Sequence, residues 1–105
     1  MCMEHLTSKD FEGKVEKAEN VVVLDFYADW CGPCRMLAPI FEELANEMDS
    51  VDFYKVNVED ASDLASRFGV RSIPTIIVFK QGEIVETLMG AMPKKNLAEV
   101  ISKHA

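Results

Sequence analysis

The sequence predicts an α/β protein with a central mixed sheet of four to five strands flanked by four helices, in a single domain over residues 1–105. Segments with helical spacing of apolar residues alternate along the chain with short apolar runs that are typical of buried strands. A hairpin signal near the C-terminal end places two antiparallel strands at one edge of the sheet. A chain of 105 residues is long enough to bury one hydrophobic core without metals or structural disulfides.

The first half of the chain is predicted to begin with a segment that is either strand or coil and then to alternate helix, strand, helix and strand. Thr7 and Asp10 are typical of a helix start, and apolar residues follow them at helical spacing up to Ala18. Residues 21–28 are apolar on both faces, as expected of a central strand that helices cover on both sides. A long amphipathic helix comes next, and residues 51–59 form a second buried strand. The apolar stripe of that helix contains Met36, Leu37, Ile40, Phe41, Leu44 and Met48.

The second half adds a short helix, the hairpin and a final helix. Residues 60–69 have helical spacing, and Gly69 is the expected end of that helix. Residues 74–90 form two strands joined by a tight turn at Gln81 and Gly82. The last helix begins at Pro93, a residue favoured in a first helical turn, and is expected to bury Leu97, Val100 and Ile101.

Composition excludes several classes of partner and location. A net charge of −7 argues against nucleic acid and against an anionic membrane as a partner. No apolar run is long enough for a signal peptide or a membrane span, so a cytoplasmic location is expected. Structural disulfides are rare in that compartment, and two cysteines close together are more often catalytic or metal-binding.

Cys31 and Cys34 lie where a predicted strand ends and a predicted helix begins. As the N-cap residue, Cys31 would face the free N–H groups of the first turn, which favour the thiolate over the thiol. Pro33 is tolerated there, and Gly32 permits another chain to approach closely. Cys34 is expected to be the less exposed of the two cysteines, so Cys31 is the predicted nucleophile and Cys34 the resolving thiol.

The main structural alternative is half of a zinc site. Cys2 and His5 are the nominal further ligands. A rigid Gly-Pro insert at a helix start is not needed to hold a metal, so redox chemistry is the preferred interpretation. Cys2 is otherwise expected to be a spare exposed thiol, and His5 and His104 are expected to be surface residues.

Asp25 and Lys55 are charged residues in the middle of predicted strands. Alternation places Asp25 on the same face as Val23 and Tyr27, and burial should raise its pKa. Asp25 is therefore either a structural acid bound by a nearby donor or a group that takes the proton of Cys34. Lys55 is either a partner of this acid or a residue at an exposed edge.

Three motifs together resemble the thioredoxin family. They are WCGPC at 30–34 after DFYA, SIPT at 72–75 and GA at 90–91, and the likeness covers essentially the whole chain. The resemblance implies the thioredoxin fold and a protein-disulfide reductase that uses a Cys31–Cys34 dithiol and needs no metal or bound cofactor. It also implies disulfide-containing protein substrates, a thioredoxin reductase that supplies electrons, and action as a monomer.

The resemblance also suggests roles for single residues. It makes Asp25 the acid that exchanges a proton with Cys34 and Lys55 the residue that modulates it. It makes the bond before Pro74 a cis bond facing the cysteines. The substrate platform would then be flat and mostly apolar, and it consists of Trp30, Gly32, Pro33, Ile73, Pro74, Gly90 and Ala91.

Two other functions remain open from the sequence. An oxidase or isomerase of the same fold usually carries histidine between the cysteines, and Pro33 cannot stabilise the thiolate as an imidazolium would. A binding subunit that does not turn over is the alternative from a different class. Ser72 stands where glycine is frequent in the family, and Tyr27 and Asp29 occupy variable positions, so these three are expected to affect only partner preference.

Overall fold

The computed structural model describes residues 3–105 and contains one four-stranded sheet. Its strands are β1 (Val21–Tyr27), β2 (Val51–Asn57), β3 (Thr75–Lys80) and β4 (Glu83–Met89), in the order β2-β1-β3-β4. β1 and β2 are parallel, whereas β3 is antiparallel to both β1 and β4. The predicted mixed sheet with a hairpin at one edge is therefore confirmed.

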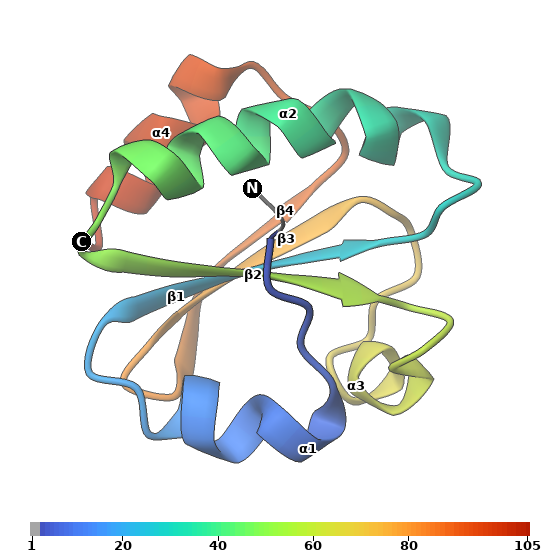
Figure 1. The fold of residues 1–105 in the computed structure, drawn as a ribbon, viewed down its shortest axis with the longest axis horizontal. Helices are drawn as coiled ribbons and strands as arrows, with labels where there is room; N and C mark the ends of the chain where they lie inside the picture. Colours follow the sequence, from blue (N-terminus) through green and yellow to red (C-terminus); the bar gives the residue numbers. More distant parts are fainter. Residues whose placement is uncertain (1–2) are drawn as a thin grey trace.

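Helices cover both faces of this sheet (Figure 1). α1 (Ser8–Phe11) continues into a π-helical segment, η1 (Glu12–Glu16), and lies with α3 (Ser62–Arg67) on one face. The other face carries α2 (Gly32–Glu47) and α4 (Lys94–Ser102). Figure 1 also shows that α2 begins beside the carboxyl end of β1, which places the two cysteines at one edge of the sheet.

The alternation of side chains along β1 divides the interior into two cores. Val22, Leu24 and Phe26 face α1 and α3, while Val21 and Val23 face α2 and α4. β1 is buried along its whole length because it is a central strand covered on both faces. Other residues of the α2 and α4 core are Leu37, Phe41, Leu44, Leu97 and Ile101.

Met36, predicted on the apolar stripe of α2, and Val100, predicted to be buried in α4, are less buried than expected. Met36 is 70% exposed, because the buried side of α2 is a narrow stripe through Cys34, Leu37, Phe41 and Leu44. Val100 is only half-buried.

The segment before α1 pairs with β2. The Lys55 N–H donates to the carbonyl of Glu4 at 3.0 Å, and the Leu6 N–H donates to the carbonyl of Lys55 at 2.9 Å. The sequence left this segment undecided between strand and coil. This pairing covers the backbone of Lys55 although β2 is the outer strand of the sheet, and the residue is half-buried, which favours the interpretation as a partner of Asp25 over that of an exposed edge residue.

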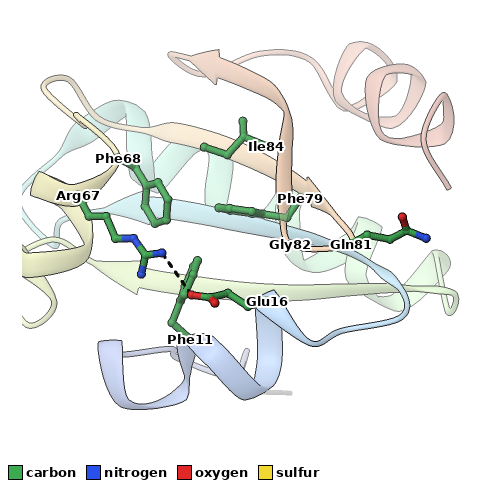
Figure 2. A pocket seen from close by; sticks show the side chains of 8 residues that line it. All are labelled: Phe11, Glu16, Arg67, Phe68, Phe79, Gln81, Gly82 and Ile84. Atoms are coloured by element: carbon green, nitrogen blue, oxygen red, sulfur yellow. Dashed lines mark hydrogen bonds and ion pairs between the residues drawn. The ribbon is translucent and has the colours of Figure 1, made fainter.

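A hollow on the α1 and α3 face lies between these helices and the β3–β4 hairpin (Figure 2). The Arg67 guanidinium stacks on Phe11 and Phe68, with its central carbon 4.8 Å and 5.2 Å from the ring centroids. It also donates to Glu16 at 3.2 Å. Arg67 is thus already paired with a carboxylate and two rings, so this hollow is a packing feature of the fold.

The hairpin turn requires glycine at one of its two positions. Gln81 and Gly82 have φ angles of 53° and 80°, the left-handed pair that a two-residue hairpin with the twist of its strands demands. A Cβ atom at Gly82 would lie 3.0 Å from the carbonyl oxygen of Glu16, which belongs to the rigid backbone of η1. Gly82 is therefore needed both for its φ angle and for the close approach of η1.

We expect Gly82→Ala to lower the free energy of unfolding by about 1–3 kcal/mol, because a Cβ atom strains the positive φ angle and clashes with η1. Gln81→Asn is the matched control and should raise stability by about a few tenths of a kcal/mol, since asparagine tolerates a left-handed φ angle. Denaturant unfolding measures both. Equal stabilities of wild type and Gly82→Ala would contradict this account of the turn.

Candidate active site

Cys31 is the N-cap residue of α2, as predicted. Its Sγ accepts a hydrogen bond from the backbone N–H of Cys34 at 3.2 Å. The same two residues form a disulfide, with their Cα atoms 5.2 Å apart. The helix start therefore holds both sulfurs within one turn and directs an amide donor at Cys31.

The predicted difference in exposure between the two cysteines is very small in the structure. Cys31 is 5% exposed and Cys34 is 4% exposed, because the disulfide packs both sulfurs against Tyr27 and Ala28. What separates them is their surroundings. The amide hydrogen bond favours negative charge on Cys31, whereas Cys34 lines an inner hollow described below.

The loop before β3 lies against Cys31. The Ile73–Pro74 peptide bond is cis, as the resemblance implies, and the Cys31 Sγ lies 3.6 Å from the carbonyl oxygen of Ile73. The Gly90 N–H donates to the carbonyl of Pro74 at 2.8 Å, so the loop after β4 joins the same surface. Tertiary contacts thus bring together segments that lie far apart in the sequence.

The predicted platform residues differ in exposure. Trp30 is 67% exposed, and Gly32, Pro33 and Ala91 are also exposed around the disulfide. Ile73 and Gly90 are half-buried, and Pro74 is buried. Pro74 therefore presents little side-chain surface at this position.

Asp25 is fully buried in the middle of β1. Neither carboxyl oxygen has a hydrogen-bond partner within residues 3–105. Burial raises the pKa of Asp25 to about 7, and the charge of Lys55 opposes this rise. The fold therefore contains an acid suited to proton exchange near neutral pH. The alternative, a structural acid bound by a nearby donor, is not supported, because residues 3–105 provide no such donor.

Lys55 is the register partner of Asp25 on the parallel strand β2. Its Nζ atom lies 4.2 Å from the centroid of the Tyr27 ring. The Tyr27 hydroxyl lies 3.1 Å from Nδ1 of His5. The expectation that His5 is a remote surface residue was therefore incomplete: His5 is exposed, but it contacts this cluster because its segment pairs with β2.

A hollow of about 140 Å³ connects this cluster with the disulfide. Cys34, Tyr27 and Lys55 line it together with Ala28, Asp29, Arg35 and Ala38. A water molecule occupies about 30 Å³ in the liquid, so the hollow has room for several. Cys34 and Lys55 thus share one hollow, and Asp25 is not among the residues that line it.

Sequence reasoning missed one buried polar contact at this edge. The Thr75 hydroxyl donates to the carbonyl of Ser72 at 2.6 Å and braces the loop that carries Ile73 and Pro74. The Ser72 hydroxyl in turn lies 3.5 Å from the sulfur of Met89, a 72% exposed residue. A threonine directly after the proline was the available signal, but only the folded loop shows what it contacts.

No group of three or more histidine, cysteine, aspartate or glutamate side chains is placed to hold a metal ion in the described part of the chain. Cys2, one of the nominal zinc ligands, lies outside the described residues. Across residues 3–105, the helices are all too short or too polar to cross a bilayer.

Comparison with known proteins gives one consistent answer. The thioredoxin family model matches residues 2–103. The chain is 47% identical to a thioredoxin of Staphylococcus epidermidis over 105 residues, which is 99% of either chain. It is 46% identical to a thioredoxin of Haemophilus influenzae over 101 residues, covering 95% of this chain and 94% of the relative.

We expect the stability of the protein to depend on the titration of Asp25. Between its ordinary value of 3.8 and about 7, the unfolded chain loses a proton that the folded protein keeps. The free energy of unfolding should therefore fall as the pH rises through this window, by up to about 4 kcal/mol from this group.

Asp25→Asn should remove that fall, which denaturant unfolding of the oxidised protein at about pH 4 and about pH 8 would measure. Glu83→Gln, at an exposed position, is the control and should keep the wild-type pH dependence. An Asp25→Asn variant with the same pH dependence as wild type would contradict the raised pKa.

Proposed function

Because this chain belongs to the thioredoxin family of dithiol–disulfide oxidoreductases, we propose that its Cys31–Cys34 pair reduces disulfide bonds in protein substrates. The observation that carries this proposal is the hydrogen bond from the Cys34 N–H to the Cys31 sulfur at the start of α2. An unpaired helix-start donor stabilises a thiolate, and the thiolate is the form of cysteine that attacks a disulfide.

In the first step the Cys31 thiolate attacks one sulfur of a substrate disulfide. A new bond joins Cys31 to that sulfur, the substrate disulfide breaks, and the other substrate sulfur leaves as a thiolate that takes a proton from water. The leading role of Cys31 follows from its N-cap hydrogen bond and from its contact with the Ile73 carbonyl, where an extended substrate chain would lie.

In the second step Cys34 resolves the mixed disulfide. Its thiol gives a proton to the Asp25 carboxylate, directly or through a water molecule, and the thiolate attacks the Cys31 sulfur. The Cys31–Cys34 disulfide forms, the Cys31–substrate bond breaks, and the second substrate sulfur leaves as a thiolate that takes a proton from water or from the protonated Asp25 carboxyl. A carboxyl with a pKa of about 7 suits this task, because near neutral pH it is ionised often enough to accept the proton and protonated often enough to return it.

The oxidised protein must then receive two electrons to begin another cycle. A thioredoxin reductase supplies them in this family, and the dithiol itself carries them, so no bound cofactor or metal is required. Lys55 modulates Asp25 through its charge on the neighbouring strand.

The surface around the disulfide suits many protein partners. We propose that the substrate backbone lies along Ile73 and Pro74, flanked by Trp30, Gly32 and Pro33 on one side and by Gly90 and Ala91 on the other. The Trp30 ring is 67% exposed and supplies a large apolar contact surface. Small residues elsewhere on the rim leave room for varied side chains near the target disulfide.

We further propose that residues 1–105 act as a single monomeric domain in the cytoplasm. A carrier that begins each cycle as a dithiol needs a compartment that keeps thiols reduced. Oxidase or isomerase activity is less suited to this site, because Pro33 offers no positive charge to the Cys31 thiolate. A purely structural subunit would not need the raised pKa of Asp25.

Cysteine variants separate the two steps. Cys31→Ser should abolish reduction of a model protein disulfide, because no nucleophile remains at the helix start. Cys34→Ser should react once and then stay bound to its target as a mixed disulfide, which mass spectrometry and non-reducing gels detect. A trapped adduct on Cys34 in the Cys31→Ser variant would reverse the proposed roles.

Pro33→His tests the assignment as a reductant. An imidazolium beside Cys31 stabilises the thiolate and hence the reduced form, so the reduction potential should rise by about tens of millivolts. Equilibration against a glutathione buffer measures the change, and Pro33→Ala is the control for loss of the ring. A wild-type potential already as high as that of the glutathione pool would favour an oxidase instead.

A further inference from the structure

Three side chains from distant parts of the sequence meet beside the disulfide. They are His5 from the N-terminal segment, Tyr27 from the end of β1 and Lys55 from β2. The Lys55 Nζ lies over the Tyr27 ring, 4.2 Å from its centroid, and the Tyr27 hydroxyl lies 3.1 Å from the His5 ring nitrogen. The His5 and Tyr27 rings meet edge to face, with centroids 5.9 Å apart. None of the steps above uses Tyr27, and the sequence alone led us to expect that it affects only partner preference.

The sheet register brings these residues together. Lys55 is directly opposite Asp25, and Tyr27 is opposite Asn57, two residues further along both strands. Residues two apart on a strand share a face, so Lys55 has Asp25 directly beside it and Tyr27 diagonally across. The Lys55 ammonium group can therefore lie near Asp25 or further along the strand toward Tyr27.

The Lys55 ammonium contacts the Tyr27 ring and makes no hydrogen bond to Asp25. Neither oxygen of Asp25 hydrogen-bonds to Lys55, whereas the Nζ is within the distance at which a cation is attracted to an aromatic face. A lysine ammonium is strongly hydrated and sits on a flexible stem, so without such a contact it moves toward water. Tyr27 is itself buried, and burial raises the pKa of its hydroxyl, so the ring stays neutral.

We infer that Tyr27 is a positioning residue for the second step of the reaction: its ring holds the Lys55 ammonium close enough to Asp25 for that charge to favour the carboxylate that receives the proton of Cys34. This inference rests on the proposed function, in which Asp25 accepts that proton. The hollow lined by Tyr27, Lys55 and Cys34 places all three groups around the same small volume.

The direction of the effect follows from the charges around this hollow. The Lys55 charge lowers the pKa of Asp25 from the value that burial alone would set. Without the ring, water and the Asp29 carboxylate at the rim of the hollow draw the ammonium away from Asp25, and the pKa of Asp25 rises further. Other titratable or charged groups near the cluster are His5, Arg35 and Asp60.

The test compares Tyr27→Leu with Tyr27→Phe in the full-length protein. Phenylalanine keeps the ring and loses only the hydroxyl that contacts His5, whereas leucine loses the ring. The readout is the pH dependence of the resolving step with a chromogenic aromatic disulfide, whose halves are released in succession by attack and by resolution. A direct titration of the Asp25 carboxyl by carbon NMR accompanies it.

We expect Tyr27→Leu to move the midpoint of both titrations to higher pH and to slow resolution near pH 7 by roughly two- to threefold, with no slowing well above the midpoint. Tyr27→Phe should match wild type. In a Lys55→Met background, Tyr27→Leu should cause no further shift, because the ring then has no charge to hold.

If Lys55→Met raises the midpoint of the Asp25 titration but Tyr27→Leu leaves it unchanged or lowers it, the inference is overturned. The proposed function would then remain intact. If Asp25→Asn resolves mixed disulfides as fast as wild type, the proposed role of the acid fails instead, and the NMR titration still tests whether Tyr27 acts on Asp25. Tyr27→Met replaces Tyr27→Leu if the latter does not fold, with the same expected shift. A loss of thermal stability without a change in midpoint would assign Tyr27 a packing role only.

Discussion

The chemistry of this molecule depends on one amide hydrogen bond at the start of α2, which the Cys34 N–H donates to the Cys31 sulfur. It exists because a helix leaves its first N–H groups without partners, and because Cys31, shortly after the end of β1, takes the N-cap position of α2. The second cysteine is one turn further on, with its Cα atom 5.2 Å from the first. Donor, nucleophile and resolving thiol are thus parts of a single local structure.

That local structure becomes a working site only through the sheet around it. β1 is antiparallel to β3, and β3 to β4, so the end of β1, the start of β3 and the end of β4 lie at the same edge. The Ile73–Pro74 loop and Gly90 therefore meet beside Cys31, joined by the hydrogen bond between Gly90 and Pro74. The alternation that fills two cores with apolar residues also turns Asp25 inward, where burial raises its pKa.

Asp25 lowers the stability of the protein once it is ionised, and the mechanism proposed above gives it a use as a proton acceptor. A buried carboxyl without a hydrogen-bond partner is unfavourable once it is ionised, and an apolar residue would fit the sheet better. The parallel neighbour β2 supplies the opposing charge of Lys55, and the Tyr27 ring lies where it can hold that charge.

The spacing of residue types along the chain was enough to predict the order of elements, the mixed sheet, the N-cap position of Cys31 and the inward direction of Asp25. Tertiary packing was needed to establish three other features. They are the nearly equal burial of the two cysteines, the exposure of Met36 and the contact of His5 with Tyr27. Periodicity tells which side of a helix or strand is apolar, but not how wide a stripe its neighbours cover. Residues 4–6 pair with β2 through backbone N–H and C=O groups, which almost every residue carries, so the pattern of side chains does not predict this pairing.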